Sequence, residues 1–228
     1  MKPNLILLHG ALGSKRHLQA LKAELNDLFN VYDLDFAGHG DQISESDFSM
    51  DLFAENLIEL INEQGIDKTH VFGYSMGGYV AITAALKSPA LFNKIVTYGT
   101  KFNWSPEIAA QEVKMLNPAK IEEKVPKFAK RLNELHSPND WKVMMRKTAD
   151  LMLRLGAGNG LKEEDFKQVN QQITIGWGSA DKMVTEAESK NVADLLPNGN
   201  FSCINEQPHP VEMIDLDALV NYIKSVLQ

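Results

Sequence analysis

Short runs of apolar and β-branched residues recur along the chain, and none of them alternates cleanly between apolar and polar positions. Unbroken apolar runs of this length are typical of strands whose two faces are both covered. The pattern therefore predicts six strands, at residues 4–10, 30–36, 69–75, 94–100, 172–178 and 201–206.

Amphipathic helix patterns lie between these runs. In residues 14–29 leucines recur every three or four positions, and Ser14 is suited to cap the first turn. Further helices are predicted over residues 50–65, 76–87 and 214–227. Strands that alternate with helices form right-handed βαβ units. The sequence therefore predicts an α/β fold, with a mostly parallel central sheet of about six strands and helices on both faces.

The alternation breaks after the fourth predicted strand. Between residues 101 and 168 helical stretches follow one another without a strand, and four prolines punctuate them. This segment is predicted to be a helical cap inserted over the strand ends, so that residues 1–100 and 169–228 form the core. A glycine-rich stretch at 156–160 lacks the G-K-[ST] ending of a phosphate loop, which favours a linker.

The composition is that of an ordinary globular protein. The 228 residues are 44% hydrophobic and 23% charged, and the formal net charge is −7. A negative net charge disfavours binding to nucleic acid or to an anionic membrane surface, so small molecules are the expected partners. No apolar run approaches the length of a membrane span or of a secretory signal, and the chain is expected to be soluble and cytoplasmic.

The chain offers little for metal binding. Cys203 is the only cysteine, so an intramolecular disulfide or a thiolate cluster from this chain alone is excluded. It lies in a strand-like run and is expected to be a small buried residue. His17, His70 and His136 form no ligand cluster with cysteines or carboxylates at metal-site spacing. No metal and no cofactor are therefore predicted.

The sharpest chemical signal is the stretch VFGYSMGGYV at residues 71–80. Ser75 lies between an apolar run and a helix pattern, with Gly73 and Gly77 two residues to either side. A turn this sharp leaves no room for Cβ atoms at the flanking positions, so glycine is required there. This is the G-x-S-x-G pattern of a nucleophile elbow, in its expected context of strand, turn and helix. The alternative is a tight turn with a capping serine.

Two further residues supply what a serine nucleophile needs. An alcohol is weakly nucleophilic, so it requires a base to take its proton and an acidic residue to orient that base. Asp181 follows the fifth predicted strand and His209 follows the sixth, which is the chain order of the hydrolase triad. Asp181 has an alternative interpretation as a turn residue and His209 as a solvated loop residue. His39 is a competing candidate for the base.

Five short motifs lie at predicted strand ends. They are HGALGS at 9–14, DFAGHG at 35–40, GYSMGG at 73–78, GSADKMV at 178–184 and PHP at 208–210. Each motif alone is weak, and together they are specific. In combination they resemble the α/β-hydrolase fold superfamily, and the resemblance covers nearly the whole chain.

This resemblance implies that Ser75 is the nucleophile, His209 the base and Asp181 the residue that orients it. It also implies an oxyanion hole formed by the backbone N–H groups of Met76 and Ala11. A physical argument supports the role of Met76, because N–H groups at the start of a helix have no partner within the helix and attract negative charge. Many members carry two antiparallel strands before the first motif, and this chain leaves no room for them, so the sheet is expected to be minimal. The edges of such a sheet are less protected, so the sequence is compatible with either a monomer or a homodimer.

Substrate specificity is expected to reside in the cap and loops. Phe102 and Trp104 leave the strand end nearest Ser75, and Met183 follows the predicted acid toward the same cleft, so these three are predicted to bind substrate. Residues 101–167 contain thirteen basic and ten acidic residues, a balance of +3 that leaves −10 for the rest. A basic lid would attract an anionic substrate. The alternative is that its lysines are the solvated faces of amphipathic helices.

These signals favour a serine hydrolase, and most of all a carboxylesterase that cleaves small to medium esters through an acyl-enzyme intermediate. Two other classes stay open. The same triad serves carbon–carbon bond hydrolases, lyases of biosynthetic pathways and haloperoxidase-like enzymes. The second class is a ligand-binding protein that kept the fold and lost the chemistry.

Overall fold

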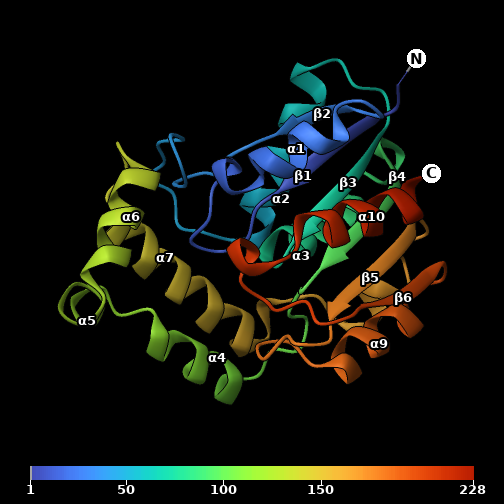
Figure 1. The fold of residues 1–228 in the computed structure, drawn as a ribbon. Helices are drawn as coiled ribbons and strands as arrows, with labels where there is room; N and C mark the ends of the chain where they lie inside the picture. Colours follow the sequence, from blue (N-terminus) through green and yellow to red (C-terminus); the bar gives the residue numbers. More distant parts are fainter. Residues whose placement is uncertain (1) are drawn as a thin grey trace.

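Six strands form one parallel sheet in the order β2-β1-β3-β4-β5-β6, and every neighbouring pair is parallel (Figure 1). The computed structural model describes residues 2–228. The strands are β1 (Asn4–Leu8), β2 (Asn30–Asp33), β3 (Thr69–Tyr74), β4 (Phe92–Tyr98), β5 (Gln172–Gly178) and β6 (Gly199–Ile204). The six strands and the α/β class predicted from the sequence are therefore confirmed.

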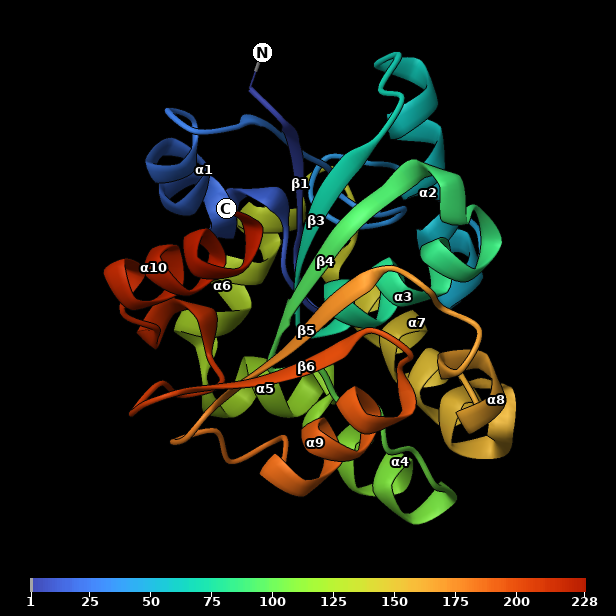
Figure 2. The same ribbon diagram turned by 90° about the vertical axis from the view of Figure 1, so that its right-hand side faces the viewer.

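Helices cover both faces of this sheet (Figure 2). One face carries α1 (Gln19–Leu25) and α10 (Leu216–Leu227), and the other carries α2 (Met50–Glu63), α3 (Met76–Lys87) and α9 (Glu186–Leu195). In β1, Leu5 and Leu7 pack in the apolar cluster under α1 and α10, whereas Ile6 and Leu8 pack in the cluster under α2 and α3. All four side chains are fully buried, which explains why the strand sequence does not alternate.

The strands β2 and β6 are the two edges of the sheet. Cys203 lies on β6, and its side chain is exposed. The expectation that this cysteine is buried is therefore wrong. The reason is its position on an edge strand, which has a neighbouring strand on one side only, so that apolar character in the sequence does not guarantee cover.

The helices that interrupt the alternation lie beyond the carboxyl ends of the strands (Figure 1). They are α4 (Pro106–Glu112), α5 (Pro118–Lys124), α6 (Pro126–His136) and α7 (Trp141–Arg154), and the short α8 (Glu163–Phe166) that follows them lies beside α9 (Figure 2). The first three begin with proline, whose missing N–H costs nothing at a first helical position. We call this segment, residues 101–168, the cap.

The α6–α7 half of the cap is tied to the loop that follows β2. The side-chain amide of Asn139 donates hydrogen bonds to the carbonyls of Gly40 and Gln42, at 3.0 and 3.1 Å. The ammonium of Lys147 donates to three consecutive carbonyls, those of residues 44–46, at 2.8–3.3 Å. These contacts fix one side of the cap over the core.

The junction between β3 and α3 brings that helix very close to β1. An ideal Cβ added to Gly77 would lie 2.5 Å from the carbonyl oxygen of Leu8 and 2.7 Å from its Cβ. A Cβ on Gly73 would run into the backbone of Gly78 across the turn. Both positions exclude a side chain, as the sequence predicted.

Replacing Gly77 by alanine is expected to lower the free energy of unfolding by about 2–3 kcal/mol, because the β1 backbone cannot yield without distorting the sheet. Urea unfolding followed by circular dichroism measures the loss. Gly65→Ala is the control, since a Cβ there meets nothing within 4 Å and only the positive φ of 62° opposes it. That strain costs about 1–2 kcal/mol. A Gly77 variant as stable as the wild type would contradict the packing argument.

Candidate active site

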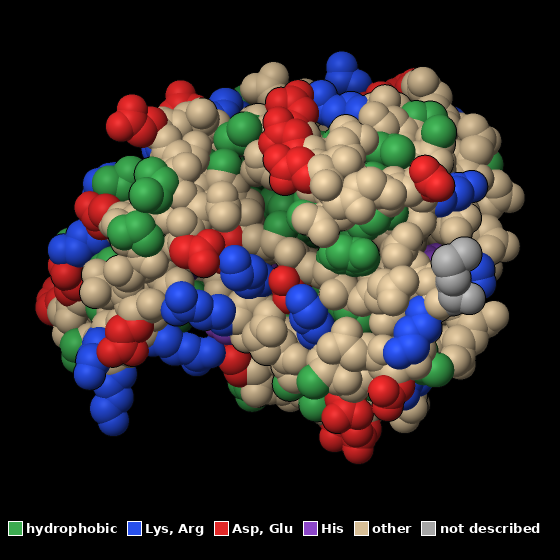
Figure 3. Space-filling model, turned by 90° about the horizontal axis from the view of Figure 1, so that it is seen from above, with side chains coloured by type: hydrophobic (Ala, Val, Ile, Leu, Met, Phe, Trp, Pro, Cys, Tyr) green, Lys and Arg blue, Asp and Glu red, His purple; other side chains and the backbone are tan. Residues whose placement is uncertain are grey.

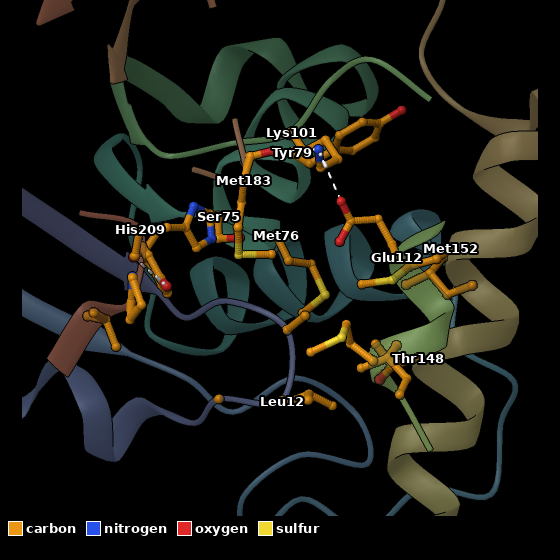
Figure 4. Close-up of a pocket in the computed structure, with 18 of the residues that line it drawn as sticks. Leu12, Ser75, Met76, Tyr79, Lys101, Glu112, Thr148, Met152, Met183 and His209 are labelled. Atoms are coloured by element: carbon orange, nitrogen blue, oxygen red, sulfur yellow. Dashed lines mark hydrogen bonds and ion pairs between the residues drawn. The ribbon is translucent and has the colours of Figure 1, made fainter. Parts of the chain in front are cut away.

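A cavity of about 580 Å³ lies between the cap and the carboxyl ends of the strands. Ser75 and His209 both line it, as do Ala11 and Met76. Figure 4 shows Ser75, Met76 and His209 together on one wall, with Thr148 and Met152 of α7 across the space. The loops that sequence analysis placed at one edge of the sheet thus meet in one cavity.

Ser75 occupies a strained turn between β3 and α3. Its backbone has φ 51° and ψ −117°, and positive φ is uncommon for a residue with a side chain. The Ser75 N–H donates to the carbonyl of Tyr98 on the neighbouring strand at 2.8 Å, and the Ser75 carbonyl accepts from Gly78 at 3.0 Å. The turn is therefore held from both sides, and the serine side chain lines the cavity at its tip.

Asp181 and His209 form a hydrogen-bonded pair. The distance between His209 Nδ1 and Asp181 Oδ2 is 2.8 Å, and the carboxylate side chain is fully buried. Its other oxygen, Oδ1, accepts from the backbone N–H groups of Met183 and Val184 at 2.7 and 3.0 Å. Burial alone would raise the pKa of Asp181, but the hydrogen bonds and the charge of His209 outweigh it and hold the pKa below its usual value. The carboxylate is therefore ionised at neutral pH and orients the imidazole.

Two tyrosines hold the loop that carries His209. Tyr74 donates its hydroxyl proton to the carbonyl of His209 at 3.0 Å, and Tyr98 donates to the carbonyl of Pro208 at 2.8 Å. Burial raises the pKa of both phenols, so they remain donors at every working pH. Neither tyrosine is among the site residues predicted from the sequence. The available signal was their position at the last residue of a strand, beside Ser75 and Gly99.

The two backbone groups expected to form the oxyanion hole lie on the cavity wall. Met76 is the first residue of α3, and N–H groups in a first helical turn have no partner within the helix. Ala11 lies in a turn closed by a hydrogen bond of 3.1 Å from the N–H of Gly13 to the carbonyl of Gly10. Leu12, the third residue of that turn, has φ 57°.

His9 and His39 are buried behind this turn. His9 accepts at Nε2 from the N–H of Phe36 at 3.2 Å, so its Nδ1 carries the proton and donates to the carbonyl of Gly10 at 2.8 Å. Burial lowers the pKa of His9 well below its usual value, and burial beside His136 lowers the pKa of His39 to about 3. Both rings are neutral and brace loops, which leaves His209 as the better candidate for the base.

Trp104 and Met183, two of the three predicted substrate contacts, line the cavity. Phe102 does not line it. Its ring is buried, stacked on Tyr79 at 5.9 Å between centroids and edge-on to Phe166 at 5.6 Å. Its backbone N–H and that of Asn103 both donate to Glu188 at 2.7 Å, which holds the backbone at this position. No local pattern in the sequence indicates that distant carboxylate partner.

The cations on the cavity wall are already paired. Lys101 forms an ion pair of 3.3 Å with Glu112 and donates to the carbonyl of Met183 at 2.6 Å. Arg131 pairs with Glu212 at 2.8 Å. On the face seen in Figure 3, Lys and Arg side chains are interspersed with Asp and Glu. The positive balance of the cap therefore does not produce an unpaired cation at these two positions.

Most of the remaining wall is apolar, with leucines, methionines and aromatic rings from both the cap and the core. These apolar lining residues include Leu12, Met50, Met76, Tyr79, Trp104, Met115, Phe128, Leu132, Leu151, Met152, Leu155 and Met183. Within residues 2–228, no group of three or more His, Cys, Asp or Glu side chains is arranged to hold a metal ion. No helix among the same residues is both long enough and apolar enough to cross a bilayer.

Comparison with known proteins places the chain in a family. A family model described as the alpha/beta hydrolase fold matches residues 3–149. The sn-1-specific diacylglycerol lipase ABHD11 of Danio rerio is 28% identical over an alignment that covers 98% of this chain and 77% of that protein. Ethanol acetyltransferase 1 of Hanseniaspora uvarum is 27% identical over 106 residues, which cover 46% of this chain and 32% of that protein. The chain thus matches only about a third of the length of this second relative.

Solved structures share the architecture. A 2-hydroxy-6-oxo-6-phenylhexa-2,4-dienoate hydrolase from a Rhodococcus species superimposes with a TM-score of 0.81 and 18% identity, covering 98% of this chain and 90% of that one. At that identity the likeness concerns the fold. The family model covers more than half of the sequence, and the parallel sheet, the strained serine turn and the cap agree with it. This chain belongs to the α/β-hydrolase fold family.

Proposed function

We propose that this protein is a serine hydrolase that cleaves carboxylic esters, with Ser75 as nucleophile, His209 as base and Asp181 as the residue that orients the base. The observation that carries the proposal is the 2.8 Å hydrogen bond between Asp181 and His209 beside a cavity that Ser75 also lines. The similarity to a diacylglycerol lipase over 98% of the chain supports ester cleavage.

In the first half of the reaction, the Ser75 hydroxyl attacks the ester carbonyl while His209 Nε2 takes its proton. Asp181 keeps the second proton on Nδ1, so that Nε2 has a free lone pair, and its charge stabilises the imidazolium that forms. The tetrahedral oxyanion would accept hydrogen bonds from the N–H groups of Met76 and Ala11. The imidazolium then gives its proton to the departing alcohol, which leaves an acyl-enzyme.

In the second half, His209 takes a proton from water, and the resulting hydroxide attacks the acyl carbonyl. The second tetrahedral intermediate collapses, Ser75 regains its proton from His209, and the free acid is released. The same backbone donors serve both intermediates. The enzyme returns to its starting protonation state after one ester bond and one water have been consumed.

The cavity supports an uncharged acyl group of small to medium size. Its volume of about 580 Å³ lies in the range typical of small-molecule sites, and its wall is dominated by apolar side chains. A carboxylate on the substrate would have to displace Glu112 from Lys101 or Glu212 from Arg131. The predicted alternative of an anionic substrate is therefore disfavoured, and the exposed Lys124, Lys127 and Lys130 act as solvated helix faces. Both observations argue against an ester that carries a carboxylate.

A carbon–carbon bond hydrolase or a lyase remains the alternative, because a hydrolase acting on a dienoate shares this fold. Acids of that kind carry a carboxylate that a site of this chemistry would pair with a cation. The internal pairing of Lys101 and Arg131 favours the ester hydrolase.

The first prediction concerns the nucleophile. Ser75→Ala is expected to lower the turnover of p-nitrophenyl butyrate by at least about 10³-fold, because the attacking oxygen is lost. A fluorophosphonate probe should label the wild type at Ser75 in a one-to-one ratio, measured by intact mass and peptide mapping, and should not label the variant. Ser49→Ala, which removes the cap of α2, should cost some stability and leave labelling intact. Wild-type turnover in the Ser75 variant would refute the proposal.

The second prediction concerns the acid. Asp181→Asn is expected to reduce kcat by about 10³–10⁴-fold, because an amide cannot stabilise the imidazolium and favours the wrong imidazole tautomer. KM should stay close to the wild-type value, since Asp181 does not line the cavity. Asp217→Asn, at an exposed position of α10, is the control and should be fully active. A loss of less than tenfold in the Asp181 variant would mean that another residue orients the base.

The third prediction concerns the acyl chain. Across p-nitrophenyl esters from acetate to dodecanoate, kcat/KM is expected to peak at a medium chain and to exceed that of a matched ester with a terminal carboxylate by at least about tenfold, because apolar groups gain most from this wall. Thr148→Phe should shift the peak to a shorter chain, since Thr148 lies across the cavity from Ser75 (Figure 4). Thr148→Val keeps the size and should leave the peak in place. Faster cleavage of a diketone or an enol-pyruvyl acid than of every ester would favour the alternative.

A further inference from the structure

The last residue of α6 is a histidine that no step of the proposed reaction uses. His136 belongs to the cap, yet its side chain is completely buried against two loops of the core. Its ring lies edge-on to that of His39, at 5.8 Å between centroids. A polar ring is costly to bury unless its nitrogens find partners.

Both nitrogens of His136 are paired, and the partners determine which one carries the proton. Nδ1 lies 3.0 Å from the backbone N–H of Gly40, which can only donate, so Nδ1 is the acceptor. Nε2 lies 3.0 Å from the carbonyl oxygen of Leu12, which can only accept, so Nε2 carries the proton. Burial lowers the pKa of His136 to about 4, so the ring is neutral at the pH where esterases are assayed.

The carbonyl that His136 binds belongs to the turn that presents Ala11. The peptide between Leu12 and Gly13 is held at both ends, because the N–H of Gly13 donates to the carbonyl of Gly10 and the oxygen of Leu12 accepts from His136. Leu12 has a positive φ of 57°, a conformation that is uncommon for a residue with a Cβ and that turns normally give to glycine or asparagine. The turn therefore relies on an outside contact to stay in this shape.

We propose that His136 is a positioning residue of the oxyanion hole, which holds the Gly10–Gly13 turn through its hydrogen bond to Leu12 so that the N–H of Ala11 points at the reacting carbonyl. The inference rests on the proposed ester hydrolysis at Ser75. It assigns to the cap a role in stabilising the transition state, in addition to forming the cavity wall. The residue touches neither substrate nor nucleophile, and it acts only through Leu12.

Two substitutions separate the two hydrogen bonds. In His136→Gln the amide nitrogen reaches the place of Nε2, so the donor to Leu12 is retained and the acceptor for Gly40 is lost. In His136→Asn the shorter side chain reaches only the place of Nδ1, so the acceptor for Gly40 is retained and the donor to Leu12 is lost. The proposal predicts that only the second change impairs the oxyanion hole.

Asn139→Ala is the matched control. Asn139 lies three residues beyond His136 and also ties the cap to Gly40, through its hydrogen bonds to the carbonyls of Gly40 and Gln42. Its contacts do not include the Gly10–Gly13 turn, so its removal loosens the cap without touching Leu12. If His136 merely fastens the cap, Asn139→Ala and His136→Asn should have similar effects on catalysis.

The experiment measures kcat, KM and the affinity for a trifluoromethyl ketone, which forms a tetrahedral oxyanion adduct with the active serine. His136→Asn is expected to lose about 10–100-fold in kcat and a similar factor in ketone affinity, with KM within threefold of the wild type, because only the transition state uses the misplaced donor. His136→Gln and Asn139→Ala should stay within about fivefold of the wild-type kcat. Equal kcat in the Asn and Gln variants, or a loss confined to KM, would overturn the proposal.

If His136→Asn does not fold, His136→Ala assayed with and without added imidazole takes its place. Restoration of kcat by imidazole at unchanged KM supports the proposal, and its absence in a folded variant overturns it. Labelling by the fluorophosphonate probe tests the enzyme class independently of the role of His136. A wild type that is labelled at Ser75 and cleaves esters, beside His136 variants with undiminished kcat, would remove the positioning role alone.

Discussion

The carboxylate of Asp181 is fully buried, and the arrangement of the strand ends depends on how it is paired. A buried charge without partners would take up a proton or destabilise the fold. Here one oxygen accepts from His209 and the other from two backbone N–H groups of the following turn. Because these donors approach from two different loops, the ends of β5 and β6 are fixed relative to each other. The hydroxyls of Tyr74 and Tyr98 extend the same network to β3 and β4.

Much of this architecture follows from local sequence. Strands buried on both faces have unbroken apolar runs, so the sheet can be predicted from the sequence. The nucleophile elbow can also be predicted, because the glycines around Ser75 indicate a turn that excludes side chains. The three residues Ser75, Asp181 and His209 can be predicted as a set, because each follows a strand that the sequence pattern identifies. Their convergence depends on strand order, which the α/β topology itself provides.

The features that sequence analysis missed depend on contacts between distant segments. The ring of Phe102 packs on Tyr79 and Phe166, and its backbone N–H donates to Glu188, 86 positions along the chain. His136 meets Leu12 across 124 positions, and no periodicity signals that pairing. The net charge of the cap also says little about the cavity. The net charge of a segment counts all of its charged residues, whereas the electrostatic field in a cavity depends on which of those residues are already paired. Lys101 and Arg131 are both paired, with Glu112 and Glu212.

The attachment of the cap has a consequence for substrate traffic. The α6–α7 half is tied to the core by the hydrogen bonds of Asn139 and Lys147 to five backbone carbonyls. Swinging the whole cap aside would break all of these contacts at once. Movement of the α4–α5 half leaves them intact, and Met115, at the cavity wall beside α4, is 77% exposed. A ligand that entered on the α4–α5 side would therefore leave the hydrogen bonds of Asn139 and Lys147 unbroken.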